Sequence, residues 1–549
     1  MADLDVAFPV LSPADMAALT ARGKPREMHA GDTLFTEGDR NRSFFVVVDG
    51  AVEIVEHSRG EPHQVTVHHP GQFTGDIDVF NGRPALVTGR AVEDGRLVEL
   101  SPGDLRRAVD ELPDLGDIII KAFLLRRELI SRGGFEGVKI IGSRFSQSAH
   151  RLRDFAQRNS IPFRFMDLET DPEAELLLRE LGVPPADTPI VVGQKGQFHR
   201  NPSNEQFASC AGLTVDLEPG HVYDLVIVGA GPAGLAASVY AASEGLDVLT
   251  VDSLAAGGQA GTSSRIENYL GFPSGISGQE LMGNAMIQAQ RFGAQISIAS
   301  AVDSLGVEGG DRRVRLVDGT RLTSRCVLIA SGVEYRKLAV PRFGDFEGAG
   351  IYYAATPMEA NLCGGEEVVV VGAGNSAGQA IVFLAKTAAR VHHLVRGDDL
   401  GASMSRYLVD RISRLSNVQP YLRTRVTSLE GNGHLGAVCA ESAELGELRF
   451  DTSSLFLFIG ADANTEWLRD CVELDNKGFV LTGDNLPRSI TDNDRWRAGG
   501  RAPFLLETSL PGVFSAGDVR SGSVKRVASA VGEGAMAVSF VHAHIGKAV

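Results

Sequence analysis

Residues 224–242 read DLVIVGAGPAGLAASVYAA, and this stretch decides the fold of the carboxyl-terminal part of the chain. The apolar run Leu225–Val228 is typical of a buried strand, and the glycines after it have the spacing G-x-G-x-x-G. In such a unit the first glycine allows a tight turn, the second lets a pyrophosphate approach the backbone, and the third brings helix and strand together. Asp252 ends the next apolar run, 23 residues after the first glycine, where a carboxylate binds ribose hydroxyls. The pattern predicts a dinucleotide-binding unit whose loop glycines are Gly229, Gly231 and Gly234.

A second unit of the same form begins at residues 367–385, EVVVVGAGNSAGQAIVFLA, so this region contains a duplicated nucleotide-binding unit. The three loop positions are held by Gly372, Gly374 and Ala377. The following strand, Arg390–Val395, ends in Arg396 rather than in an acid. An arginine there favours the 2′-phosphate of NADPH over the free ribose of NADH, although Asp398 and Asp399 follow closely. We therefore expect NADPH at the second unit.

The composition of the 549 residues excludes several classes of protein. Apolar residues make up 43% and charged residues 22%, close to the values of ordinary soluble proteins. The net charge of −16 argues against nucleic acid as the main partner. The five cysteines are scattered, which disfavours a disulfide framework or a cysteine-rich zinc site, and we expect no metal. No secretory signal opens the sequence, and Ile118–Ile130 is too short and too charged to span a bilayer, so we expect a cytoplasmic protein without a membrane partner.

Two further segments precede the nucleotide-binding units. Residues 1 to about 110 carry short β-like runs, such as Ser43–Val48, between Gly and Asp turns, which indicates a barrel or roll. A helix is expected to follow over Leu112–Ser131. Residues 135–216 alternate strand and helix, which indicates a small α/β unit. We place the boundary between the two segments at Gly133-Gly134.

Residues 221–549 resemble a thioredoxin reductase, a flavoenzyme in which an NADPH domain is inserted into an FAD domain. Besides the two loops, the matching motifs are AAGGQAGTSSRIENY (255–269), LIASG (328–332), FLFIGADANT (456–465) and GVFSAGDVRSGSVKRVASAVGEGAMAV (512–538). The resemblance implies two Rossmann-like domains and a homodimer. The FAD domain would cover residues 221–338 and 462–549, and the NAD(P)H domain residues 339–461.

The same resemblance implies which residues bind the two cofactors. Gln259 and Asn268 are expected near the flavin, and the segment Lys525–Ala530 is expected over the isoalloxazine ring. Gly517 and Asp518 are expected beside the ribityl and phosphate groups. The full set of expected cofactor-binding residues is Gly229, Gly231, Pro232, Ala233, Gly234, Asp252, Gly258, Gln259, Asn268, Gly332, Gly372, Gly374, Asn375, Ser376, Ala377, Arg396, Gly517, Asp518, Arg526, Val527 and Ala528.

The sequence departs from that family at its redox-active cysteines. Thioredoxin reductases pass electrons from the flavin to a C-x-x-C pair just before the second nucleotide loop. The corresponding stretch here is GIYYAATPMEANLC (350–363), where Ala354 and Pro357 hold the two cysteine positions. Without a thiolate beside the flavin, dithiol exchange has no nucleophile. Cys363 is a candidate for a mixed disulfide with a partner, and the alternative is a buried structural cysteine.

Residues 135–216 resemble a thioredoxin or glutaredoxin fold, with Thr188-Pro189-Ile190 where that fold carries a cis-proline. The redox cysteines should follow the first strand, but residues 143–148 read SRFSQS. The resemblance therefore implies a thioredoxin-like domain without redox cysteines, which docks, positions or recognises rather than reacts. Ser146 is expected to cap a helix.

Residues 1–134 resemble a cyclic-nucleotide-binding domain, a β-roll. The stretch MHAGDTLFTEGDRNRSFFVVVDGAVEIVEH (28–57) matches its opening turns and strands, and GDIDVFNGRPALVTGRA (75–91) matches its phosphate-binding cassette. In that family a glutamate of the cassette holds a ribose hydroxyl, and an arginine about nine residues later holds the cyclic phosphate.

The cassette of this chain differs at both of those positions. Asp76 shortens the glutamate, and Ala85 stands where the arginine is expected. Arg83, two positions early, or Arg90 could reach the phosphate instead. Loss of a charge-assisted contact removes roughly 1.5–3 kcal/mol of binding energy. The sequence leaves two alternatives: cyclic-nucleotide binding through Asp76 and Arg83, or a ligand-free or differently specific regulatory barrel.

The sequence as a whole predicts a cytoplasmic, NADPH-dependent FAD oxidoreductase whose activity the amino-terminal domains regulate. Its acceptor is not its own disulfide; the candidates are a protein partner, a quinone, another small oxidant or a one-electron carrier. Two alternatives stand beside this function. One is a thioredoxin-disulfide reductase-type activity that uses Cys363 with a partner, and the other is a flavin-based sensor or scaffold without turnover.

Overall fold

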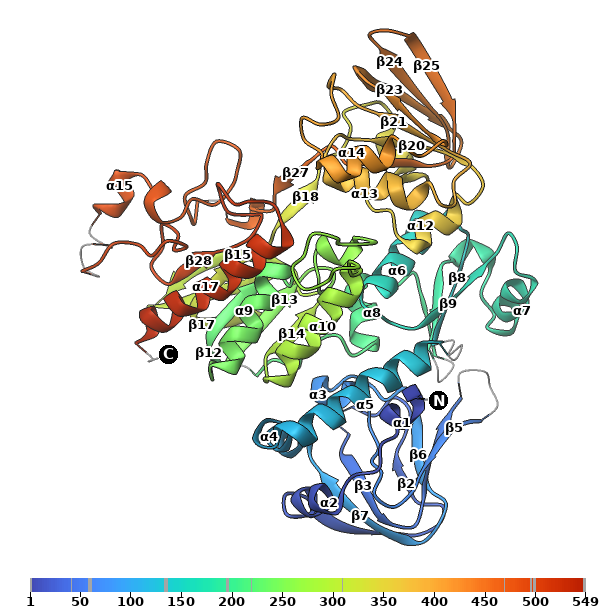
Figure 1. Ribbon diagram of the computed structural model, residues 1–549, viewed down its shortest axis with the longest axis vertical. Coiled ribbons are helices and arrows are strands. Elements are labelled where there is room, and N and C mark those ends of the chain that lie inside the picture. Colours follow the sequence, from blue (N-terminus) through green and yellow to red (C-terminus); the bar gives the residue numbers. More distant parts are fainter. Residues whose placement is uncertain are drawn as a thin grey trace. The chain divides into compact units, whose positions relative to one another are not determined.

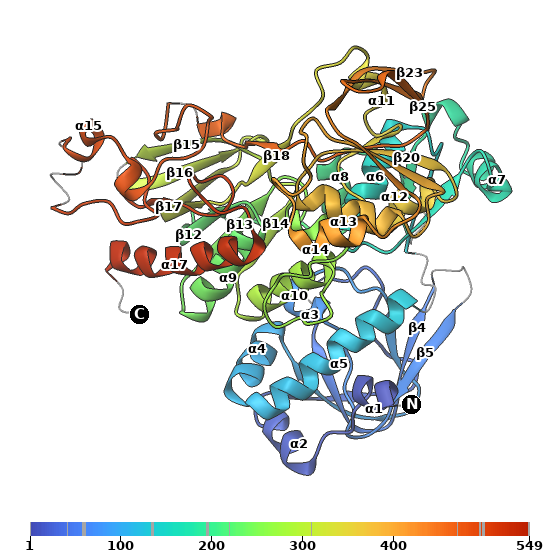
Figure 2. The ribbon, with the colours of Figure 1, turned by 45° about the horizontal axis from the view of Figure 1, so that its top comes forward.

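The computed structural model describes the chain except for residues 1, 41, 58–61, 133–136, 194–196, 219, 309, 469, 494–495, 497–499 and 547–549. Figures 1 and 2 show its ribbon. The chain forms two compact units. Unit 1 contains residues 1–142, 159–216 and 290–295, and unit 2 contains residues 143–158, 217–289 and 296–549. The predicted boundary at Gly133-Gly134 lies outside the described residues.

The first part of unit 1 is a roll of short antiparallel strands. Three strands pair in the order β1–β7–β3 and four in the order β2–β6–β4–β5. Their inward side chains, among them Phe35, Phe45 and Val52, pack into one core. The strands are β1 (Lys24–Met28), β2 (Thr33–Phe35), β3 (Phe44–Asp49), β4 (Val52–Glu56), β5 (His63–His68), β6 (Thr88–Ala91) and β7 (Gly95–Leu100).

The helices of this part confirm one prediction. The helix expected over Leu112–Ser131 is α5 (Pro113–Arg132), and a separate helix that was not predicted, α4 (Pro102–Glu111), precedes it. Pro113 explains the break, because proline cannot continue a helix that precedes it and is favoured in the first turn of the next. The remaining helices are α1 (Ala2–Ala7), α2 (Pro13–Thr20) and α3 (Asp78–Asn81), the last lying within the cassette.

The second part of unit 1 is a four-stranded mixed sheet in the order β11–β10–β8–β9. β8 pairs with β9 in parallel and with β10 antiparallel. The Thr188–Pro189 peptide bond, just before β10, is cis. The elements are β8 (Val138–Gly142), β9 (Phe163–Asp167), α7 (Pro172–Glu180), η1 (Pro185–Asp187), β10 (Ile190–Val192), β11 (Phe198–Arg200) and α8 (Asn204–Cys210). The helix that follows β8, α6 (Gln147–Arg158), is grouped with unit 2.

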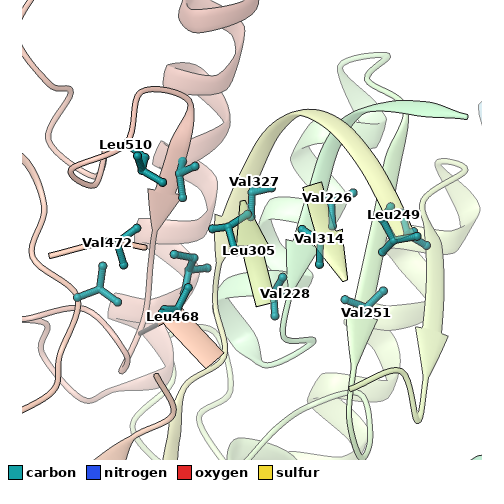
Figure 3. Close-up of a cluster of buried hydrophobic side chains, with 14 of the residues drawn as sticks. Val226, Val228, Leu249, Val251, Leu305, Val314, Val327, Leu468, Val472 and Leu510 are labelled. Carbon is teal, nitrogen blue, oxygen red and sulfur yellow. The ribbon is translucent and has the colours of Figure 1, made fainter. Parts of the chain in front are cut away.

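The larger sheet of unit 2 has seven strands in the order β14–β13–β12–β17–β16–β15, with β28 pairing with β17. β13, β12, β17 and β28 run parallel, whereas β15, β16 and β17 are antiparallel. The strands are β12 (Val222–Val228), β13 (Val248–Asp252), β14 (Gln295–Ile298), β15 (Val302–Glu308), β16 (Asp311–Leu316), β17 (Arg321–Ile329) and β28 (Val513–Ser515). Buried side chains such as Val226, Val314 and Leu468 form its core (Figure 3).

Three helices accompany this sheet: α9 (Pro232–Ser243), α10 (Gly278–Arg291) and α17 (Val527–Ile545). α17 lies along α9 (Figures 1 and 2), so closely that a side-chain carbon at Gly534 would be 2.1 Å from the carbonyl oxygen of Ala233. Shorter turns are η2 (Ala260–Thr262), η3 (Glu466–Leu468), η4 (Gly483–Asn485) and α15 (Arg488–Thr491).

The second sheet of unit 2 has five parallel strands in the order β19–β26–β20–β21–β22. They are β19 (Ile351–Tyr352), β20 (Glu367–Val371), β21 (Arg390–Leu394), β22 (Val418–Tyr421) and β26 (Leu455–Leu457). The accompanying helices are α11 (Phe343–Phe346), α12 (Pro357–Leu362), α13 (Asn375–Leu384) and α14 (Arg406–Ile412). β23 (Thr424–Gly431), β24 (Leu435–Ser442) and β25 (Gly446–Asp451) form an antiparallel sheet beside it.

Two short strands connect the sheets of unit 2. β18 (Val333–Tyr335), where the chain leaves the seven-stranded sheet, pairs antiparallel with β27 (Ala461–Ala463), where it returns. Within the described part of the chain, no helix has the length and apolarity that crossing a membrane requires.

Candidate functional site

The first nucleotide loop joins β12 to α9, and its glycines have different structural roles. Gly229 has φ +108°, and a side-chain carbon there would lie 2.2 Å from the carbonyl oxygen of Ala330. At Gly234 the same carbon would lie 1.8 Å from the carbonyl oxygen of Gly229. Around Gly231, by contrast, no described atom lies within 4 Å of that position. The outer two glycines are therefore required by backbone packing, and the middle one opens on free space.

The amino terminus of α9 is arranged to receive an anion. Gly231 is its N-cap residue and offers no side-chain cap, so the first N–H groups of the helix are left for another acceptor. Phosphate groups bind such helix ends because the free N–H groups and the helix dipole both favour negative charge.

Asp252, at the end of β13, stands beside this loop. Its carboxylate accepts backbone hydrogen bonds from Ala230 and Leu254, both at 2.8 Å, and from Ala255 at 3.0 Å. Burial raises the pKa of Asp252, and the three N–H donors oppose that effect. The donors hold the carboxylate at the carboxyl edge of the sheet, where the predicted ribose contact would be made.

These residues open on a cavity of about 600 Å³ within unit 2. Many of the residues expected from the sequence line it, including residues of both nucleotide loops. They are Gly231, Pro232, Ala233, Asp252, Gly258, Gln259, Asn268, Gly332, Asn375, Ser376, Gly517, Asp518, Arg526 and Val527. Of the described residues, those expected at the site but not lining this cavity are Gly229, Gly234, Gly372, Gly374, Ala377, Arg396 and Ala528.

The carboxyl-terminal segment closes one side of the cavity. The backbone N–H of Gly517 donates to Glu533 on α17 at 2.8 Å, which fixes the turn before Asp518. Burial is the main cause that raises the pKa of Asp518, Glu533 adds to it, and Lys525 opposes it. Lys525 itself stands over the ring of Phe479, 4.5 Å from its centroid. The motif at residues 512–538 is thus folded against the first loop.

The second nucleotide loop repeats the geometry of the first. Gly372 has φ +145°, and a side-chain carbon there would lie 2.3 Å from the carbonyl oxygen of Phe458, whereas Gly374 has open space around it. α13 begins at Gly374 without a side-chain cap. His393 on β21 contacts the carbonyl oxygen of Gly372 through Nε2 at 2.6 Å, and burial lowers the pKa of His393. A neutral imidazole that donates this hydrogen bond holds the loop.

Arg396 follows β21 and is exposed. Because β20 and β21 are parallel and adjacent, Arg396 and the loop after β20 lie at the same edge of the sheet. Asn375, at the start of α13, accepts a hydrogen bond from the backbone N–H of Ser405 at 2.6 Å and also lines the cavity.

The residues present fit two dinucleotides. Each loop has one glycine without a neighbour where a phosphate would approach, and each is followed by a helix without a side-chain cap. Asp252 supplies a half-buried carboxylate at the first loop, and Arg396 an exposed guanidinium beside the second. Residues of both loops line the same cavity, so the two ligands would bind at one site.

Comparison with known proteins agrees with this geometry. Residues 223–534 match the family described as pyridine nucleotide-disulphide oxidoreductase. The chain belongs to that family. Residues 25–111 match the cyclic nucleotide-binding domain. The molecule is therefore multidomain, and this domain precedes the oxidoreductase region in the sequence.

Several relatives of the oxidoreductase are thioredoxin reductases. The chain is 32% identical over 325 residues to that of Treponema pallidum, covering 59% of this chain and 97% of the relative. It is 33% identical over 317 residues to that of Mycolicibacterium smegmatis, covering 58% and 94%. The crystal structure of T. acidophilum thioredoxin reductase superposes with a TM-score of 0.51 at 29% identity, covering 58% of this chain and 98% of that one. The protein is an NADPH-dependent FAD oxidoreductase of the thioredoxin-reductase type.

The cysteines of the oxidoreductase do not form a redox centre at the cavity. Ala354 lines the cavity, and no cysteine does so among the described residues. Cys363 is fully buried, and its thiol lies 3.2 Å from the carbonyl oxygen of Glu359. Burial raises the pKa of Cys363 to about 11 and that of Cys326 to about 12. Both thiols therefore stay protonated at neutral pH, and the geometry favours a structural role for Cys363.

Sequence reasoning missed several residues that line the cavity. Arg158, on α6, pairs with Asp154 at 2.8 Å and reaches the cavity from a segment far from either loop. Tyr335 and Asn464 come from the paired strand β18 and the residue after β27. Lys337 and Gln379 are two others. The glycine motifs carry no signal for Arg158, because it belongs to the preceding α/β segment.

In the cyclic-nucleotide cassette, Asp76 and Arg83 do not converge on one site. Asp76 is buried and forms an ion pair with buried Arg42, which also donates to the carbonyl oxygen of Arg83 at 3.2 Å. Arg83 instead lines a cavity of unit 1 to which Asp76 does not contribute. Ala85 is fully buried, and exposed Arg90 pairs with Glu53. Arg42 is another residue that sequence reasoning missed.

Proposed function

We propose that the oxidoreductase carries electrons from NADPH to an acceptor outside the chain, without a thiol relay of its own. The observation that carries this proposal is the pair Ala354 and Pro357, which occupies the positions of the family's cysteines beside a cavity without a described thiol. When bound, FAD would supply hydride chemistry: it would take two electrons and one proton from NADPH and pass two electrons to an external oxidant such as a quinone, which would become the quinol by taking up that proton and one from water.

The residues of the chain supply binding and orientation for this reaction. The amino terminus of α9 would hold the FAD pyrophosphate at Gly231, and Asp252 would hold the ribose. The first turn of α13, with Asn375 and Ser376, would hold the pyrophosphate of NADPH at the same cavity. Lys525 and Arg526 bring positive charge to the wall beside Asp518.

Arg396 would select NADPH over NADH. Its guanidinium is exposed beside the second loop, at the edge where a 2′-phosphate is read. Charge-assisted hydrogen bonds to a phosphate are about twice as strong as neutral ones, so this contact can distinguish the two nucleotides.

The α/β segment at residues 135–216 would be a thioredoxin-like domain that positions rather than reacts. Its helix α6 packs against the segment that replaces the cysteine motif: Gln157 bonds Thr356 at 3.4 Å, and the rings of His150 and Tyr352 are 5.5 Å apart. Ser146 caps α6 through the N–H of Ala149 at 3.3 Å, as the sequence predicts. A helix at this place covers the approach that an external dithiol would need.

The remaining assignments follow from the same reasoning. We assign residues 1–134 to a regulatory cyclic-nucleotide-binding-like domain, 221–338 and 462–549 to FAD, and 339–461 to NADPH. We further propose a cytoplasmic homodimer, by resemblance to thioredoxin reductases. The buried ion pair of Asp76 and Arg42 supports a barrel of altered specificity rather than one that binds cyclic nucleotides through Asp76 and Arg83.

Steady-state oxidation of NADPH with defined acceptors tests the proposal. We expect turnover with a quinone and none with thioredoxin, and the same rates in the Cys363→Ser variant, because its thiol does not reach the cavity. Thioredoxin reduction that disappears in the Cys363→Ser variant would show instead that a thiol relay operates. Absence of NADPH oxidation with every acceptor, in protein that binds FAD, would favour a sensor without turnover.

A further inference from the structure

Unit 1 contains a cavity of about 240 Å³ that the proposed reaction does not use. Its wall comes from the cassette loop around Pro84, from α5 and from the α/β segment that carries β10 and α8. All of these elements belong to the same compact unit. The cavity therefore lies where the two parts of unit 1 meet.

The charged residues in this wall are mainly cationic. Arg40, Arg83 and Arg127 line the cavity with one carboxylate, Asp78. Asp78 forms an ion pair with Arg127, and Arg40 donates to the carbonyl oxygen of Ser209 at 2.6 Å. Asp78 neutralises one of the three arginines, and a carbonyl oxygen adds no charge, so the wall keeps an excess of positive charge.

Arg83 is the arginine of this wall whose guanidinium N–H donors have no partner among the described residues. None of those described residues forms a hydrogen bond or a salt bridge with its guanidinium. Burial lowers the pKa of Arg83 to about 10, with Asp78 opposing and Arg127 adding to the effect, so the group is still charged at neutral pH. A partly buried guanidinium with five unused N–H donors is a recognition group for carboxylate or phosphate.

The rest of the wall is apolar. Pro84, Leu86, Val191 and Phe207 contribute hydrocarbon surface. The exposed polar pair Cys210 and His199, with Sγ and Nε2 3.4 Å apart, also lines the cavity. Small-molecule sites combine such apolar walls with a few polar groups that fix orientation. The shape and chemistry suit a ligand with an apolar body and one anionic group.

We propose that this cavity binds a small organic anion, and that Arg83 holds its phosphate or carboxylate group. The interior of the roll does not compete for that role, because Arg42 and Asp76 satisfy each other there. The cassette thus presents its spare arginine toward the α/β segment. A ligand in this place would contact both parts of unit 1 at once.

Titration calorimetry of the full-length holoprotein with phenyl phosphate tests this proposal. We expect one site per chain, and affinity lower by about tenfold or more in Arg83→Gln, since a charge-assisted pair is lost. The matched control is Arg96→Gln, which removes an exposed arginine of β7 outside the cavity and should leave binding unchanged. Phenylacetate in place of phenyl phosphate distinguishes a carboxylate from a phosphate site, and phenol should not bind.

A second readout uses Cys210, which lines the same cavity. Phenyl phosphate should slow alkylation of Cys210, measured by peptide mass spectrometry, in the unmodified protein and not in Arg83→Gln. This protection also tests the proposal if the variant fails to fold. The proposal is wrong if neither anion binds up to roughly 10 mM, which corresponds to under about 3 kcal/mol, or if Arg83→Gln and the unmodified protein bind equally.

Discussion

Substitution of Gly231 by valine should remove FAD from the protein while leaving the fold intact. Apart from the adjacent residues, no described atom lies within 4 Å of the position that the first carbon of the new side chain would take, and φ at Gly231 is −72°, which valine adopts. The cost to the apoprotein is therefore the weaker N-cap alone, about 1 kcal/mol, or a fall in Tm of roughly 2–4 °C. The side chain would instead fill the space where the pyrophosphate approaches the helix.

The matched control is Gly234→Ala, three residues further along the same loop. Its added carbon would lie 1.8 Å from the carbonyl oxygen of Gly229, so the backbone itself must move. We expect a cost of about 3 kcal/mol or more, which corresponds to a fall in Tm of at least roughly 6 °C. One variant should thus lose the ligand and the other the fold.

The assay combines circular-dichroism melting of the apoproteins with FAD titration followed by flavin fluorescence. For Gly231→Val we expect an increase in Kd for FAD of at least about 100-fold, or roughly 2.8 kcal/mol. The reasoning is refuted if Gly231→Val keeps stoichiometric FAD after purification. It is refuted equally if this variant melts as early as Gly234→Ala.

Three further predictions follow from the second loop, the buried thiol and the cassette. Arg396→Ala should lower the kcat/KM preference for NADPH over NADH by about tenfold or more, whereas Arg390→Ala, at the opposite end of β21, should not; equal effects would exclude the assignment. In native protein at pH 8, iodoacetamide should modify exposed Cys210 but spare buried Cys363. The pKa of Cys363 is raised to about 11, so its thiolate forms only as the pH rises toward that value. Rapid modification of Cys363 at pH 8 would contradict its burial. Asp76→Asn should destabilise the roll by about 3–5 kcal/mol by leaving the buried Arg42 charge unpaired, and an unchanged melting curve would show that the pair is not buried.

Local patterns made much of the fold predictable. Strand, glycine loop and helix follow one another within about 20 residues at each nucleotide site, so a short window of sequence contains the whole motif. The apolar positions of Leu112–Ser131 likewise predicted α5 (Pro113–Arg132), whereas α4 (Pro102–Glu111) was not predicted. The local signals for α4 are Ser101, its N-cap residue, and Pro102 in its first turn.

Contacts between distant segments were not predictable in the same way. Arg42 meets Asp76 across 34 residues, and Arg158 reaches the cavity from the segment that precedes the first nucleotide loop. Neither arginine belongs to a motif, so their positions depend on how the strands and α6 pack. For Cys363 the sequence left two alternatives, a mixed disulfide or a buried structural cysteine, and the structure favours the second because Cys363, just after α12, packs in the core of the five-stranded sheet.

Anaerobic titration of the purified holoprotein with NADPH tests most directly whether electrons stop at the flavin. Because Ala354 and Pro357 replace the family's cysteine pair and Cys363 is buried without a second thiol at the cavity among the described residues, we expect full reduction of the flavin at one NADPH, or two electrons, per FAD. Uptake of four electrons per FAD, with new free thiols appearing in step, would contradict the account.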